Sequence, residues 1–121
     1  MQYLRLYTDA QGESHFADVD VELQSVDYAP PAPPLHLSAY QPARQYSFMV
    51  APAGWEGDWH PSPHRQMLVV LKGELEMEVS DGEVRRLRPG DVSIGEDTSG
   101  KGHRSLVIGE ADCVLAIVHL A

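Results

Sequence analysis

Four polar residues occupy every second position of the stretch DWHPSPHRQ, namely His60, Ser62, His64 and Gln66. Two imidazoles and an amide so close together can ligate a transition metal or hydrogen-bond a small molecule. The same residues can equally form a polar rim above a core strand with nothing bound, and the sequence leaves both interpretations open. An ion bound here would be Zn, Ni, Cu or Fe(II), because Mg and Ca prefer oxygen ligands.

Prolines determine the backbone of this stretch. Pro61 and Pro63 disfavour helix at the preceding residues, so His60 and Ser62 adopt β or polyproline-II geometry. In a β-strand the four polar side chains all point one way, whereas the threefold repeat of polyproline II separates them. The apolar run 67–71 follows, and we expect a strand covered on both faces, with the polar residues at the mouth of a barrel.

The rest of the chain predicts an all-β protein. Short segments with alternating or continuous apolar residues are separated by Gly, Asp and Pro, and no long segment has the 3.6-residue spacing of a helix. The strands are expected in 2–8, 15–23, 45–52, 66–73, 74–80, 83–88, 91–95, 103–109 and 112–120. Regular short strands of this kind indicate a sandwich or barrel. The proline-rich segment 29–34 is expected to be a polyproline-II connector that separates an N-terminal β arm (1–34) from the barrel core (35–121) within one domain.

The segment 76–88 is expected to form a β-hairpin. Its predicted loop is 81–83, with Gly82 near positive φ. The expected cross-strand pairs are Met77 with Leu87, Glu78 with Arg86 and Glu76 with Arg88.

Composition narrows the class of partner. The formal net charge of −9 over 121 residues argues against nucleic acid and anionic membranes as partners. No run of about 20 apolar residues is present, and the first residues lack the features of a signal peptide, so we expect a soluble, cytoplasmic protein. Cys113 is the only cysteine, and its apolar surroundings predict a small buried residue.

The residues around His60 resemble the first motif of the cupins, which are small jelly-roll β-barrels (double-stranded β-helices). That motif reads Gly, five residues, His-x-His, three or four residues, Glu, six residues, Gly. The frame fits Gly54, His60, Gln66 and Gly73 without insertion. The second motif, Pro-x-Gly-x-x-His, resembles TSGKGH, which ends at His103, and RPGD precedes it as it commonly does in cupins. The resemblance covers about residues 45–120 and extends to small stand-alone cupins with no assigned reaction.

The departures from the family pattern concern the metal ligands. Ser62 stands where cupins have their second metal-binding histidine, and Gln66 replaces the glutamate. The resemblance therefore implies a metal site formed by His60 and His103, with Gln66 as a neutral ligand and His64 as a possible substitute for the missing imidazole.

Other residues near the motifs are candidates for the wall of a ligand pocket. Trp55 and Trp59 flank His60 and suit a planar or apolar ligand, although large aromatics are also ordinary packing in a small barrel. Asp58 offers a charge beside the motif, and Asp97 and Ser62 are expected to line the mouth.

Two functions from different classes follow. The first is an enzyme, a metal-dependent oxygenase, isomerase or lyase that acts on a small polar, carboxylate-bearing molecule. The alternative is a non-catalytic binding or sensor protein that holds a small metabolite without metal. In either case we expect a homodimer, because strand 67–71 is apolar on both faces and the segment 15–23 could cover an open sheet edge across a two-fold axis.

Overall fold

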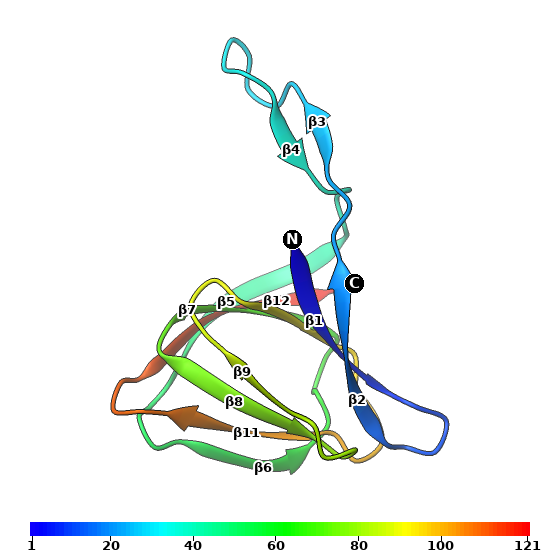
Figure 1. The fold of residues 1–121 in the computed structure, drawn as a ribbon, viewed down its shortest axis with the longest axis vertical. Coiled ribbons are helices and arrows are strands. Elements are labelled where there is room, and N and C mark those ends of the chain that lie inside the picture. The colour runs from blue at the N-terminus through cyan, green and yellow to red at the C-terminus, as the bar shows by residue number, and fades with distance from the viewer.

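The computed structural model describes all 121 residues and consists of β-strands and connecting segments (Figure 1). The strands are β1 (Gln2–Thr8), β2 (Ser14–Asp20), β3 (Gln24–Val26), β4 (Leu35–Leu37), β5 (Ala43–Ala51), β6 (Glu56–His60), β7 (Gln66–Lys72), β8 (Glu74–Val79), β9 (Val84–Leu87), β10 (Val92–Gly95), β11 (His103–Ile108) and β12 (Cys113–Leu120). No helix is long and apolar enough to cross a membrane.

Two sheets enclose the core. The larger has the order β2-β1-β10-β7-β12-β5, and the smaller has the order β6-β11-β8-β9. Alternate residues of the strands point inward, and the most deeply buried apolar side chains are Leu6, Val70, Val79, Cys113 and Leu115. The two sheets close over this core as in a jelly roll (Figure 1), which confirms the all-β prediction and the expected burial of Cys113.

Each segment predicted to be a strand contains one. The sequence did not predict β3, β4 and β6. The first two are only three residues long, too short to show alternation. In β6 a bulge interrupts the alternation, because the register with β11 pairs His60 with His103 but Gly57 with Ser105.

The hairpin of β8 and β9 exists, but its predicted register is wrong by two residues. The observed pairs are Leu75 with Leu87, Glu76 with Arg86, Met77 with Arg85 and Glu78 with Val84. The loop is Ser80–Gly82, closed by the Val79 N–H donating to the Glu83 carbonyl at 3.1 Å. Gly82 has φ of +97°, as predicted, but it is the last loop residue, which is where a three-residue hairpin loop requires positive φ.

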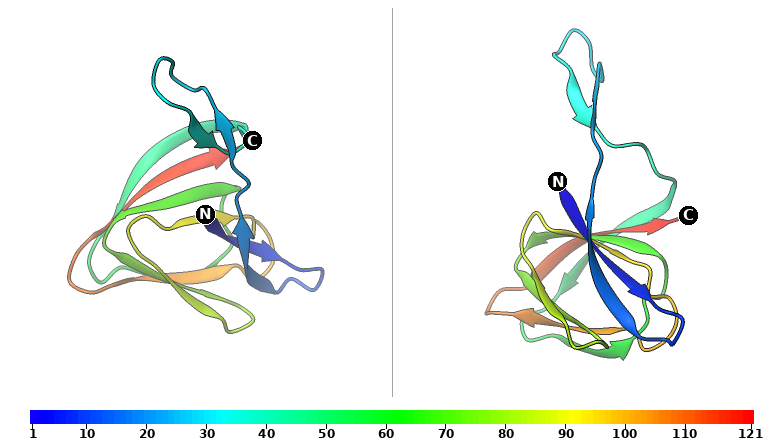
Figure 2. Two further views of the ribbon diagram at one scale, coloured as in Figure 1. Left: turned by 45° about the horizontal axis from the view of Figure 1, so that its top comes forward. Right: turned by 45° about the vertical axis from the view of Figure 1, so that its right-hand side comes forward.

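The N-terminal region divides differently from the predicted boundary at residue 34. β1 and β2 belong to the large sheet, and residues 14–20, part of the segment expected to pair across a two-fold axis, pair with β1 of the same chain. β3 and β4 pair only with each other, and residues 29–34 form part of the loop between them. This hairpin projects away from the barrel in every view (Figures 1 and 2).

Candidate functional site

His60 and His103 face each other in adjacent strands. The register of β6 with β11 places them directly opposite, and their ring centroids are 4.8 Å apart. His103 is buried and His60 is exposed, so the pair has one anchored and one accessible ring. The structure thus brings together the two histidines that come from different motifs of the chain.

Hydrogen bonds at Nδ1 orient both rings. The Nδ1 of His60 lies 2.6 Å from the carbonyl oxygen of Asp58. Because a carbonyl oxygen can only accept, this Nδ1 carries the proton and donates, and Nε2 is left as an acceptor. The Nδ1 of His103 lies 2.6 Å from Oδ2 of Asp97, and Nε2 of this ring also has no partner within the protein. The arrangement leaves two Nε2 atoms for an outside group.

Asp97 holds the His103 ring in place. Its side chain is completely buried, and its Oδ1 accepts a hydrogen bond from the Ser62 hydroxyl at 2.7 Å. The Asp97 carbonyl also accepts the Ser62 N–H at 2.9 Å. Gly95 makes room for this contact, because a Cβ there would lie 2.5 Å from the Ser62 hydroxyl oxygen. Ser62 therefore fixes Asp97 and does not point at the two imidazoles.

His64 lies in a second pair of histidines. The segment 61–65 is irregular, so the alternation expected from β geometry does not continue through it. The His64 ring stacks 4.4 Å from that of His119, whose Nδ1 lies 2.9 Å from Nε2 of Gln45. His119 and Gln45 were not among the predicted site residues, although the alternation of β12 gives His119 the inward direction of the buried Leu115.

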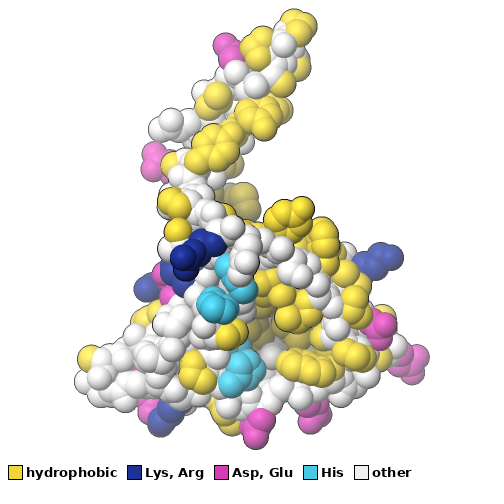
Figure 3. Space-filling view, turned by 180° about the vertical axis from the view of Figure 1, so that it is seen from behind, with side chains coloured by type: hydrophobic (Ala, Val, Ile, Leu, Met, Phe, Trp, Pro, Cys, Tyr) yellow, Lys and Arg dark blue, Asp and Glu magenta, His cyan; other side chains and the backbone are white.

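Gln66 connects the two histidine pairs along one end of the barrel. In register it stands between Gly95 of β10 and His119 of β12. Gly95 in turn borders Ser62, which bonds Asp97 beside His103, so these contacts connect His119 of the large sheet with His103 of the small sheet. Figure 3 shows histidines along one face of the molecule, with positive side chains at one end and an apolar hollow beside them.

Positive charge gathers around the second pair. Arg44, Arg65, Gln45, His64 and His119 line a hollow of about 520 Å³. The Nε of Arg65 is held by Glu96 at 2.7 Å. Partial burial opposes ionisation of Glu96, but hydrogen bonds from Arg65 and Arg5 outweigh it and lower the pKa of this carboxyl.

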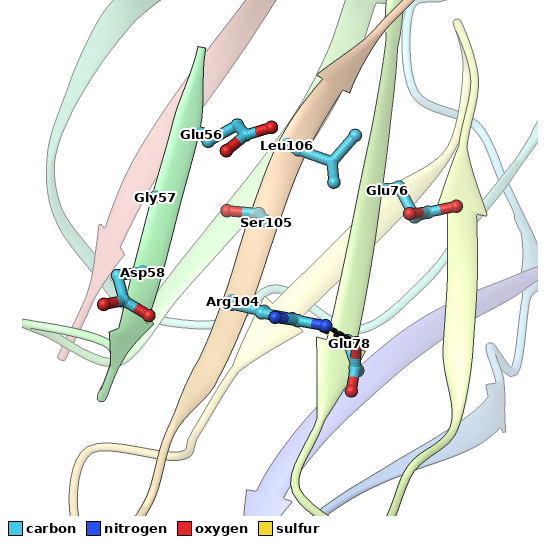
Figure 4. Close-up of a pocket in the computed structure, with 8 residues that line it drawn as sticks. All are labelled: Glu56, Gly57, Asp58, Glu76, Glu78, Arg104, Ser105 and Leu106. Carbon is cyan, nitrogen blue, oxygen red and sulfur yellow. Dashed lines mark hydrogen bonds and ion pairs between the residues drawn. The ribbon is translucent and has the colours of Figure 1, made fainter.

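Asp58 and Trp59 face the outside of the small sheet. The Trp59 ring stacks with the Arg104 guanidinium at 5.5 Å, and the Asp58 side chain points into a hollow on the outer face of the small sheet (Figure 4). The β6 bulge explains the position of Asp58, since its extra residue separates this side chain from the face on which His60 lies. The Trp55 ring covers Gly57, where any Cβ would collide with it.

The outer hollow in Figure 4 is mainly acidic. Its eight lining residues are Glu56, Gly57, Asp58, Glu76, Glu78, Arg104, Ser105 and Leu106. Arg104 is bound by Glu78 at 2.7 Å, so the one cation is already paired. This hollow offers no counterpart to the buried, oriented groups behind His103, and we place the candidate site at the histidine pair.

The residues do not complete a metal site. No group of three or more His, Cys, Asp or Glu side chains is positioned to hold an ion. His60 and His103 converge, but His64 stacks on His119. Both carboxylate oxygens of Asp97 are already hydrogen-bonded, one to Ser62 and one to His103. Of the four predicted ligands, the structure thus pairs the imidazoles of His60 and His103, and Gln66 would add only a neutral amide.

Comparisons with known proteins agree on the fold. A family model described as a cupin domain matches residues 46–119. No curated protein matches the sequence. The cupin domain of Schizosaccharomyces pombe Cnp3 is similar over 100% of this chain and 83% of that chain, with 19% identity and a TM-score of 0.55.

Two further solved structures are comparable. KdgF from Halomonas sp. is 23% identical over 81% of this chain and 88% of that chain, with a TM-score of 0.51. A cupin 2 conserved barrel domain protein from Salinispora arenicola CNS-205 is 19% identical over 84% and 76%, also with a TM-score of 0.51. At these identities the similarity shows the fold alone.

Proposed function

The chain belongs to the cupin domain family, and from this premise we propose that it binds a small, carboxylate-bearing metabolite at the open end of its barrel. The observation that carries the proposal is the pair of unpartnered Nε2 atoms on His60 and His103, with each Nδ1 already bonded. Because each Nδ1 donates, each Nε2 can accept a hydrogen bond from a hydroxyl group of the metabolite without first breaking a hydrogen bond inside the protein. The carboxylate of the same molecule would be bound by positive charge at this end of the barrel.

The site is held rigid before a ligand arrives. Asp97 is fully buried and bonds both His103 and Ser62, so the His103 ring has little freedom to turn. A group that is already oriented loses less conformational entropy on binding, which favours affinity. This is the physical reason for assigning recognition to His103 in particular.

The charges around the second histidine pair favour a carboxylate. Arg44 is exposed, forms none of the ion pairs of the structure and lines the hollow with His64 and His119. An unpaired cation beside two imidazoles, in a chain of net charge −9, attracts an anion locally where the rest of the surface repels it.

Metal binding is the second candidate function. The observation that favours it is that the Nδ1 atoms bond a carboxylate and a backbone carbonyl, as the second ring nitrogens of metal-binding histidines do. His60 and His103 would hold the ion, and Gln66 or the metabolite would supply the other ligands. An oxygenase, isomerase or lyase activity would depend on that ion, whereas binding of a metabolite by the protein alone would not.

Isothermal titration with malate and citrate, which carry a hydroxyl group beside their carboxylates, tests the first function after treatment of the untagged protein with a chelator. We expect wild type to bind at least one of them and His103→Ala to lose binding. His36→Ala is the matched control, because His36 lies in the exposed β4 away from the barrel. Equal binding by wild type and His103→Ala would refute the site.

Elemental analysis of untagged protein purified without added ions tests the second function. Metal in stoichiometric amount in wild type, lost in both His60→Ala and His103→Ala, would support it. Metal that persists in these variants would place the ion elsewhere.

A further inference from the structure

The β3–β4 hairpin is unsupported within its own chain. Its strands are three residues long, pair only with each other, and stand off the barrel in Figures 1 and 2. Residues 22–36 are all exposed, although they include Leu23, Val26, Tyr28 and Leu35. An isolated two-stranded hairpin is at best marginally stable in water, so this one requires a surface to pack against.

A second apolar surface lies on the outside of the large sheet. In the edge strand β5, Tyr46, Phe48 and Val50 alternate along one face and are 75%, 68% and 57% exposed. They stand beside Val118, Ala116 and Val114 of β12, respectively. Met67 and Val69 of β7 continue the same face, opposite Val118 and Ala116.

An open antiparallel sheet normally presents polar residues on its solvent side. Here the outer face is apolar across three neighbouring strands, from β5 to β7, and the space-filling view shows hydrophobic side chains both on the hairpin and on the barrel (Figure 3). Apolar surface of this extent marks a protein contact.

We propose that two copies of this chain form a two-fold dimer in which the β3–β4 hairpin of each packs on the outer face of β5 and β12 of the other. Both unpartnered surfaces belong to one chain. In a two-fold dimer each hairpin therefore covers the sheet face of the other copy, and no such surface is left exposed. A different protein seated on the sheet would leave the hairpin uncovered, so a second copy accounts for more of the structure.

Charge and backbone agree with this occupant. The segment between β2 and β5 contains Glu22 and Asp27 but no Lys or Arg, so it is acidic. Arg44, at the start of β5, has no ion pair. β5 is also the last strand of its sheet, and its free edge offers unpaired backbone groups to an incoming strand. The apolar contact requires no bound ligand, although Arg44 also lines the hollow of the proposed ligand site.

Sedimentation equilibrium on the full chain tests the assembly. We expect wild type to be a dimer at micromolar concentration. Phe48→Glu on the sheet and Val26→Asp on the hairpin should each raise the dissociation constant about tenfold or more, because each introduces an unpaired charge into an apolar contact. Val84→Glu is the matched control, since Val84 is also exposed but lies on β9 of the other sheet. A monomeric wild type would overturn the proposal.

Cross-linking distinguishes this dimer from any other. Chains carrying Val26→Cys and chains carrying Phe48→Cys are mixed and oxidised. The native Cys113 does not compete, because it is fully buried and burial raises the pKa of its thiol. We expect a disulfide between the two kinds of chain, and none when Val84→Cys replaces Phe48→Cys. A dimer that is insensitive to Phe48→Glu and yields no such disulfide would overturn the hairpin exchange. Both substituted positions are exposed, and circular dichroism verifies that each variant is folded.

Discussion

Asp97 and His103 are joined by a buried contact of 2.6 Å between Oδ2 and Nδ1, in which the carboxylate is completely shielded from water. Burial of a carboxylate is unfavourable unless its oxygens are hydrogen-bonded, and here Ser62 satisfies the other oxygen. The contact therefore links the loop after β10, the loop after β6 and the start of β11 at the same end of the barrel.

Removal of this carboxylate is expected to destabilise the fold. In Asp97→Ala the buried His103 Nδ1 and Ser62 hydroxyl lose their partner, and we expect the free energy of unfolding to fall by about 1–3 kcal/mol. Asp97→Asn keeps an acceptor and should cost less. Urea denaturation measures both, with the exposed Glu110→Ala as control, for which a change within about 0.5 kcal/mol is expected. A loss for Asp97→Ala as small as that of the control would contradict the role of this contact.

Two glycines provide a matched test of the backbone next to His60. Gly102 has φ of +69°, and a Cβ there would collide with the His60 carbonyl and with Pro61. Gly109 has φ of +83° but no atom near its Cβ position. Gly109→Ala should cost about 1–2 kcal/mol from backbone strain alone, and Gly102→Ala should cost clearly more and weaken ligand binding. Equal losses would show that His60 and its neighbours move aside easily.

The sequence predicted the meeting of His60 and His103 because both lie in motifs whose frame and order resemble those of cupins. It could not predict that the rings of His64 and His119 lie 4.4 Å apart, because no spacing in the chain relates the two residues. Closure of the barrel places the loop before β7 next to the end of β12. Asp58 was assigned to the pocket from its place beside the motif, and alternation does not reveal the bulge that turns its side chain outward. The extra residue in β6 alters the direction of the side chains between Gly57 and His60.

The hairpin of β8 and β9 illustrates a milder limit. A shift of two residues keeps every side chain on its predicted face, so the apolar pattern could not distinguish the two registers. Only the place of Gly82 within the loop decides between them. The apolar outer face of β5 was likewise not foreseen, because alternation cannot tell whether a second layer covers a strand.

Neutralising Arg44 is expected to weaken carboxylate binding. Arg44→Gln removes the cation that has no partner in the hollow around His119, and we expect about two- to fivefold weaker binding of malate or citrate, as for an exposed charge pair. Arg86→Gln, on the outer face of the other sheet, is the control. The difference between the two variants should shrink at high salt. If Arg44→Gln binds as wild type does at low salt, the anion lies elsewhere.

The stability of the protein should also depend on pH through His15. Its Nε2 lies 2.7 Å from Asp9 and its Nδ1 lies 2.7 Å from Asp81, and these hydrogen bonds, first that of Asp9 and then that of Asp81, raise the pKa of His15 above 6.5. Hydrogen bonding lowers the pKa of the two carboxyls below 3.8. The interaction connects the hairpin of β1 and β2 with that of β8 and β9, so its loss should lower the free energy of unfolding.

The sign follows from the raised pKa of the imidazole. Because the folded protein holds the His15 proton more tightly than the unfolded chain, the stabilisation is complete below pH 6.5 and disappears as pH rises through the folded pKa. Below pH 3.8 the same stabilisation is lost again, because the two carboxyls are protonated as pH falls through their lowered pKa values. Melting temperatures of wild type and His15→Asn from pH 5 to 9 should therefore differ most at the acid end of this range and converge at the alkaline end. His36→Asn should give no such trend, and a constant difference between wild type and His15→Asn would show that His15 acts by packing alone.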